Sequence, residues 1–257
     1  MNTKKLREYF LDLLNPNKEI INDGAANDLQ INSYNENITK IAFAVSPSLE
    51  LFKQAKDWGA DVIVCHHSLN LWERGIQKSI PNKILNDRMK YLYENNMSLF
   101  GFHYLLDSDD NIGHNALILK SLGVEKLEKF GNLGGDNWGQ SGEFEEEIDL
   151  VEIVDELDKM FLGNSNFMNF GLDKVKKIAC VSGSGTDCLQ EAYEKDIDLF
   201  ITGDIREPTQ EIARELGINI LWGGHYITER VAMIELCKKL ESDLDIECKF
   251  IDVMNKI

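Results

Sequence analysis

The chain lacks the features of a disulfide-stapled, secreted or membrane protein. Its five cysteines are an odd number and include no Cys-x-x-Cys pair, which argues against a disulfide framework and against a thiolate zinc site. No segment approaches the roughly 18 uninterrupted apolar residues of a membrane span, and the N-terminal residues mix charges among leucines, unlike a signal peptide. We therefore expect a cytoplasmic protein with reduced thiols and no membrane partner.

Proline and clustered positive charge are also scarce. The 257 residues include only four prolines, and a chain of this length can bury a core in one large domain or two modest ones without metal staples. The net charge is −17, and no basic run exceeds a pair such as Lys176–Lys177. Because a polyanion would be repelled by that charge, nucleic-acid binding is disfavoured.

Strand-like and helix-like patterns alternate from residue 40 onward. Short apolar, β-prone runs cover residues 40–46, 61–67 and 97–104, and helical periodicity covers 48–59 and 81–96. Strand, helix and strand at this spacing predict βαβ units and a sheet with much parallel character. The fold class is therefore α/β.

A glycine-rich stretch at residues 130–150 interrupts this pattern. We place a domain boundary there and predict two domains, 1–130 and 131–257. A second βαβ series follows a helix at 151–162, with strands at 176–185, 197–204 and 218–224, helices at 187–196, 208–217 and 228–244, and an edge strand at 246–253.

The five histidines fall in three short segments at the ends of predicted strands. His66 and His67 end the buried run 61–65, where both imidazoles can turn toward one site. A pair of capping or core histidines is the alternative for these two residues taken alone.

The second segment carries His103 and Asp107, four residues apart, which together offer a nitrogen and a carboxylate suited to a divalent ion. His114 follows in the same segment. Asp109 and Asp110 are either weaker ligands or an Asx turn that caps the helix starting near Ile112, and we favour the cap.

The third segment places His225 and Glu229 at i and i+4 across a helix start, so both side chains lie on one face. A surface hydrogen bond is the alternative for this pair alone. All three segments lie at the carboxyl ends of strands, where open α/β sheets build their sites. Their coincidence there favours a metal site.

Four imidazoles and two carboxylates exceed the needs of one tetrahedral zinc ion, and carboxylates can bridge two ions. We predict two divalent ions per chain, with Glu229 or Asp107 as the bridge. The mixed ligand set suits zinc, iron or manganese and argues against calcium or magnesium. The predicted ligands are His66, His67, His103, Asp107, His225 and Glu229.

Two further turns have alternative interpretations. Residues 182–186 read Ser-Gly-Ser-Gly-Thr between a strand and a helix, which is either a phosphate cradle or a tight turn. Residues 202–204 read Thr-Gly-Asp, and Asp204 either supports a ligand imidazole or caps a helix.

These motifs, in this order, resemble a dinuclear-metal family, the GTP cyclohydrolase 1 type 2 homologues or Ngg-interacting-factor-like proteins. The matching stretches are VCHHSLN, HYLLDSDDNIGHN, CVSGSGTD, ITGDI and GHYITE. Thr-Gly-Asp replaces the family's usual Thr-Gly-Glu, and residues 205–217 lack the histidines that often follow it. The resemblance implies the same ligands, with His103 either a sixth ligand or a supporting group. It also implies two related α/β lobes with mixed, largely parallel sheets facing each other across the metal site, and assembly into a homohexameric toroid.

We expect a metal-dependent hydrolase acting on a small molecule, a nucleotide or a phosphoester, because two ions sharing a water lower its pKa and polarise the electrophile. The alternative is a non-catalytic metal-binding regulatory or metal-trafficking protein. No Walker loop or arginine fork narrows the substrate further.

Overall fold

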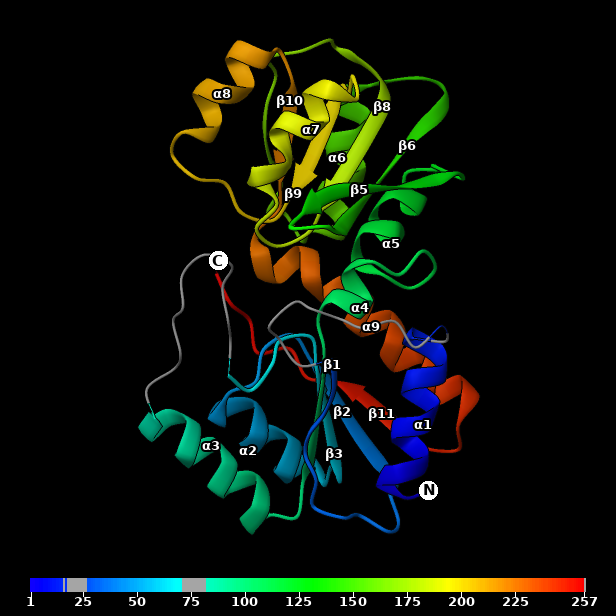
Figure 1. Cartoon of the computed structure of the whole chain (residues 1–257), viewed down its shortest axis with the longest axis vertical. Coiled ribbons are helices and arrows are strands. Elements are labelled where there is room, and N and C mark those ends of the chain that lie inside the picture. The colour runs from blue at the N-terminus through cyan, green and yellow to red at the C-terminus, as the bar shows by residue number, and fades with distance from the viewer. Residues whose placement is uncertain (16, 18–26, 71–81, 257) are drawn as a thin grey trace. The chain divides into compact units, whose positions relative to one another are not determined.

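The computed structural model describes residues 1–15, 17, 27–70 and 82–256. Its contacts divide the chain into two compact units. Unit 1 holds Met1–Leu106 and Met233–Met254, and unit 2 holds Asp107–Ala232 and the last residues of the chain. Each unit has one β-sheet with helices packed on it (Figure 1), which confirms the α/β class.

Unit 1 is built on a five-stranded sheet in the order β1-β4-β3-β2-β11. Three strand pairs are parallel, and only β1 runs antiparallel to its neighbour β4. β11 is an edge strand, as the sequence predicted. The elements are α1 Thr3–Leu14, β1 Asn27–Ile31, β2 Lys40–Ala44, α2 Leu49–Trp58, β3 Val62–Cys65, α3 Asn82–Glu94, β4 Ser98–Phe102 and β11 Glu247–Phe250.

Helices cover both faces of the unit 1 sheet (Figure 1). Alternate strand residues, among them Ala42 and Ile63, pack into a buried cluster with Phe52 of α2. On the other face Phe10 of α1 lies 5.2 Å from Phe100 and 4.8 Å from Phe102, between ring centroids. The buried strands therefore form the middle layer of three.

Unit 2 has a six-stranded sheet in the order β5-β6-β8-β9-β10-β7. The centre β8-β9-β10 is parallel, and the flanking pairs are antiparallel. The strands are β5 Leu127–Leu133, β6 Asp136–Asp149, β7 Asn166–Met168, β8 Lys174–Val181, β9 Leu199–Thr202 and β10 Asn219–Trp222. The helices that lie wholly in unit 2 are α5 His114–Ser121, α6 Leu150–Met160, α7 Leu189–Glu194 and α8 Thr209–Leu216, with a 3-10 turn at Thr186–Cys188. Two helices have residues in both units, α4 Tyr104–Asp107 and α9 His225–Asp243.

The glycine-rich stretch 130–150 is a β-hairpin of unit 2. Gly134 and Gly135 have φ values of +71° and +100°, and they turn β5 into β6, which also pairs with β8. The glycines thus make the turn of a hairpin and permit close strand contacts. The predicted division into domains 1–130 and 131–257 cuts through β5 and stays a prediction about domains.

The carboxyl ends of parallel strands carry the motifs in both units. In unit 1, His66 follows β3 and His103 follows β4. In unit 2, the loops that begin at Ser182, Gly203 and Gly223 follow β8, β9 and β10. Because parallel strands end at the same edge of a sheet, each unit gathers its candidate side chains there.

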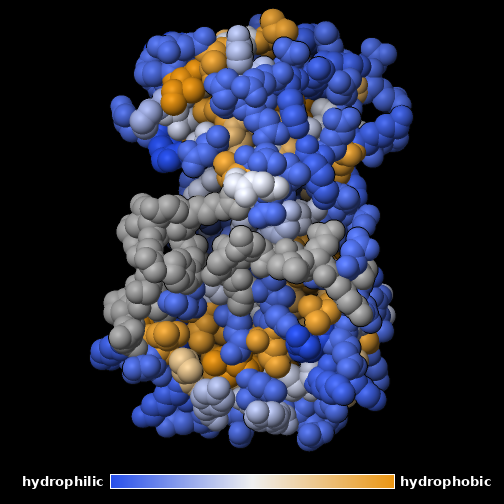
Figure 2. Space-filling model, in the orientation of Figure 1, coloured by the Kyte–Doolittle hydropathy of each residue, from blue (hydrophilic) through white to orange (hydrophobic). Residues whose placement is uncertain are grey.

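The visible surface of unit 2 is mainly polar. Hydrophilic side chains prevail on the face of unit 2 seen in Figure 2. Among the described residues, no helix has the length and apolar character needed to cross a membrane.

Candidate metal centre

Three imidazoles converge in unit 1. One ligand nitrogen from each of His66, His67 and His103 lies within 4.8 Å of the other two. The ring centroids are 4.9 Å apart for His66 and His67 and 4.9 Å apart for His66 and His103. His66 and His67 are buried, and His103 is half-buried. This cluster can hold a divalent ion, because borderline metals take imidazole nitrogens at close range.

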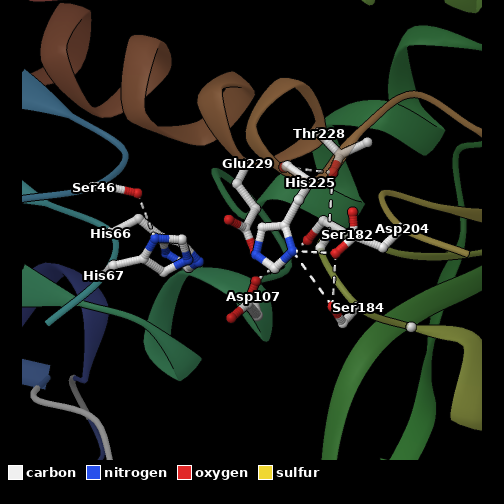
Figure 3. A network of polar contacts seen from close by, with 12 residues as sticks. Ser46, His66, His67, Asp107, Ser182, Ser184, Asp204, His225, Thr228 and Glu229 are labelled. Atoms are coloured by element: carbon white, nitrogen blue, oxygen red, sulfur yellow. Dashed lines mark hydrogen bonds and ion pairs between the residues drawn. The ribbon is translucent and has the colours of Figure 1, made fainter. Parts of the chain in front are cut away.

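Two of these rings are held by hydrogen bonds at Nδ1. The Nδ1 atom of His66 lies 2.9 Å from the carbonyl oxygen of Phe102, and Nδ1 of His67 lies 2.8 Å from Oγ of Ser46 (Figure 3). A backbone carbonyl only accepts, so Nδ1 of His66 carries a proton, and the neutral ring then has its lone pair on Nε2. Metal-binding histidines in proteins are typically held in this way.

In unit 2, His225 and Glu229 lie one turn apart on α9. Nε2 of His225 is 3.1 Å from Oε1 of Glu229, whose side chain is only 4% exposed. The loop after β10 positions this helix start, since Gly223 and Gly224 donate to the carbonyls of Thr202 and Gly203. An imidazole and a buried carboxylate thus share one face of the helix, as the i, i+4 spacing predicted.

Asp204 and Ser184 hold the other side of the His225 ring (Figure 3). Oδ2 of Asp204 lies 2.6 Å from Nδ1 of His225 and accepts a 2.9 Å hydrogen bond from Oγ of Ser184. Burial lowers the pKa of His225, but the charge of Glu229 and the hydrogen bonds to Asp204 and Glu229 outweigh it and raise the pKa to about 11. In the metal-free protein this ring is therefore an imidazolium between two carboxylates. The alternative role of Asp204, a helix cap, is not what its side chain does here.

Asp107 is buried in unit 2 beside β8. Its Oδ1 lies 3.3 Å from Oγ of Ser182, and its carbonyl oxygen accepts from Nδ2 of Asn115 at 3.0 Å. A ring nitrogen of the fully buried His114 lies within 4.8 Å of a carboxylate oxygen of Asp107. Asp107 is thus a carboxylate fixed among polar partners.

The two neighbouring acids have other roles. Oδ1 of Asp109 accepts from the backbone N–H groups of Asn111 and Ile112 at 2.7 and 2.8 Å, which is the favoured Asx turn. Oδ1 of Asp110 accepts from Lys129 and Gln140.

The Ser-Gly-Ser-Gly turn at residues 182–185 is held in place by side chains of the protein. The N–H groups of Ser182, Gly183 and Gly185 donate to Asn115, Thr228 and Thr202 at 2.7, 3.1 and 3.0 Å. Because these three donors are engaged within the protein, the structure favours the tight turn over the phosphate cradle.

The family of this chain follows from its match over almost the full length. The family model described as Duf34/NIF3 (NGG1p interacting factor 3) matches residues 1–256. The chain belongs to the Duf34/NIF3 family. The resemblance drawn from the motifs is therefore confirmed.

Relatives and solved structures agree with this membership. Proteins named "GTP cyclohydrolase 1 type 2 homolog" from Archaeoglobus fulgidus and Borreliella burgdorferi are 34% and 32% identical, each match covering 98% of both chains. The structure titled "protein ybgI, unknown function" has a TM-score of 0.87 at 27% identity, with both chains fully covered. Reduced HcgD from Methanocaldococcus jannaschii has a TM-score of 0.82 at 25% identity, covering 98% of both chains.

In this Duf34/NIF3 protein, the sequence singled out the candidate metal ligands but not most of the residues that hold them in place. The structure brings together His66, His67 and His103 in unit 1, and His225 with Glu229 in unit 2. Sequence reasoning gave Ser184 only as part of the turn at residues 182–186, with no role beside His225. It did not single out Ser46, Asn115 or Thr228, which hold a site residue or the turn behind the site. Serine, threonine and asparagine are too common in loops and helices alike for spacing to mark them.

Proposed function

We propose that this Duf34/NIF3 protein binds two divalent metal ions and uses them to hydrolyse a small molecule, a nucleotide or a phosphoester. The observation that carries the proposal is the Nδ1 hydrogen bond of His66 to the Phe102 carbonyl, because it directs a lone pair of the ring into a cluster of imidazoles. Zinc, iron and manganese suit the ligand types. The proposed ligands are His66, His67 and His103 from unit 1 and Asp107, His225 and Glu229 from unit 2.

The donor set fits such ions chemically. Imidazole nitrogens and buried carboxylates are borderline and hard donors, and six of them exceed the needs of a single tetrahedral ion. When bound, a metal pair supplies a water of lowered pKa and a positive charge that polarises the substrate. Six protein ligands over two ions leave positions for that water, which supports an enzyme over a purely structural site.

The role of the chain's own residues would be to bind the two metal ions and to fix their positions. Asp107 and Glu229 are 5% and 3% exposed, so both carboxylates are shielded from water, and each would supply oxygen donors to the proposed ions. The nucleotide class rests on the name of the relatives, which includes GTP cyclohydrolase. A common fold hosts many reactions, so the substrate panel must be wider than GTP.

Elemental analysis of the purified chain tests the metal proposal first. We expect about two ions per chain, and His225→Ala should lower that number while circular dichroism stays unchanged, because a chain of this length holds its core without metal. Removal of metal with a chelator should likewise leave the fold intact. No metal after reconstitution with zinc, iron or manganese would end the proposal.

Turnover is then measured with the identified ion on nucleotides and phosphoesters. Hydrolysis that is lost in His225→Ala supports the enzyme. Two bound ions without turnover on any substrate would move the assignment to a metal-binding regulatory or metal-trafficking protein. Assembly into a homohexameric toroid rests on the family resemblance and is a proposal that light scattering can test. A cytoplasmic location rests on the sequence pattern and is also a proposal.

A further inference from the structure

Asp204 is tied into three loops of unit 2. The N–H groups of Gly203 and Asp204 both donate to the carbonyl of Gly183, at 2.9 and 2.7 Å, which joins the loop after β9 to the loop after β8. Its carboxylate contacts Ser184 in the loop after β8 and His225 at the start of α9, which follows the loop after β10 (Figure 3). The carboxylate of Asp204 is therefore held close to the imidazole ring of His225 and has little freedom to move away from it.

The contact with Asp204 holds a proton on Nδ1 of His225. A carboxylate only accepts hydrogen bonds, so Nδ1 must be the protonated nitrogen at the 2.6 Å contact. The other nitrogen, Nε2, is the one that lies beside Glu229 at 3.1 Å. When the imidazolium loses one proton, the shorter contact at Nδ1 favours loss from Nε2, and the lone pair then lies on the side of the proposed ligand Glu229.

We infer that Asp204 is a positioning residue that keeps the proton of His225 on Nδ1 and so presents Nε2 to a metal ion. This inference rests on the proposed metal site and assigns a role to the acid of the Thr-Gly-Asp turn. Ser184 is the second support, because its hydroxyl donates to the same carboxylate oxygen and lies 3.4 Å from Nδ1. Carboxylates that hold a metal-binding imidazole in this way raise its basicity and fix its orientation.

Zinc affinity tests the consequence of this arrangement. Dissociation constants are measured by competition with a chromophoric chelator, on Asp204→Asn and on the matched control Asp187→Asn. Asp187 is an acid of the same unit, 63% exposed, and it pairs with Arg206. We expect Asp204→Asn to weaken zinc binding by about 10- to 100-fold, and Asp187→Asn to leave it unchanged. Asp204→Glu should recover part of the loss if the longer side chain still reaches Nδ1.

The hydrogen bond itself is tested without metal. In the metal-free protein with ¹⁵N-labelled histidine, the Nδ1 proton of His225 should give a downfield, slowly exchanging resonance. Asp204→Asn should move it upfield, because a neutral amide oxygen is a weaker acceptor than a carboxylate, and Asp187→Asn should leave it in place. An unshifted resonance in Asp204→Asn would overturn the inference. So would an upfield shift with wild-type zinc affinity, because Asp204 would then not act on metal binding. If the wild-type chain binds no metal, the proposed function is wrong. The role assigned to Nε2 is then wrong as well, whatever the NMR result for each variant.

Discussion

Gly183 lies directly against the carboxylate of Glu229. A Cβ atom at residue 183 would lie 2.3 Å from Oε1 of Glu229 and 3.2 Å from Nε2 of His225. Gly183→Ala must therefore displace two proposed ligands, and we expect it to weaken zinc binding about tenfold, equivalent to about 1.4 kcal/mol. Calorimetric titration with zinc measures the change.

A second glycine, Gly134, serves as a control that distinguishes the effect of this contact from the effect of backbone strain. Gly183 has a φ of +62° and Gly134 a φ of +71°, but a Cβ atom at Gly134 would meet nothing within 4 Å. Alanine at either position should cost about 1–2 kcal/mol of folding stability in urea unfolding, because both sit in the left-handed region. Only Gly183→Ala should change zinc affinity, and equal affinities in the two variants would contradict the argument.

Asp107 and Asp109 differ by two positions and should differ in metal binding. Asp107 is buried, whereas Asp109 caps the backbone of Asn111 and Ile112. We expect Asp107→Asn to reduce the metal content measured by mass spectrometry. Asp109→Asn should leave that content unchanged, because an asparagine oxygen can still accept both backbone bonds. Loss of metal in both variants would show that the second acid also takes part.

The sequence located the candidate residues because their signals are local. Histidine is rare in this chain, and each of these side chains lies within a few residues of a strand end or helix start, so His66, His103 and His225 stood out. The alternation of strands and helices from residue 40 onward is also confirmed, because buried parallel strands read as short apolar runs.

What the sequence did not reveal depends on contacts between distant residues. Asn115 meets Ser182 across 67 positions and Thr228 meets Gly183 across 45 positions, and no spacing rule connects such pairs. The N-terminal helix α1 was not predicted either, although Phe10 packs on Phe100 and Phe102. The pairing of β5 with β6 was not predicted, because the glycines between them also suit a linker.

The thiols of Cys237 and Cys248 should resist alkylation in the folded protein. Burial raises the pKa of each to about 12, which lowers the reactive thiolate fraction near pH 8 by roughly a hundredfold or more. Iodoacetamide labelling followed by peptide mass spectrometry should show slow modification in buffer and fast modification in urea. Because the folded-state pKa values are the higher ones, these thiols favour folding below about pH 9, and that contribution declines as the pH rises toward 12. Fast labelling of Cys248 in buffer would contradict the burial argument.

His114 should matter for stability and not for metal stoichiometry. Its Nδ1 accepts a 3.2 Å hydrogen bond from the N–H of Ala232, so the neutral ring carries its proton on Nε2 and acts as a donor there. Since the side chain is fully buried, His114→Ala removes packing and leaves a backbone donor without this acceptor, which should cost about 2–4 kcal/mol in urea unfolding. The folded variant should still bind as much metal per chain as the wild type. A fall in metal content under conditions where the variant is fully folded would instead show that His114 is a ligand. To bind a metal ion, the ring would have to give up either the hydrogen bond to Ala232 or the proton on Nε2.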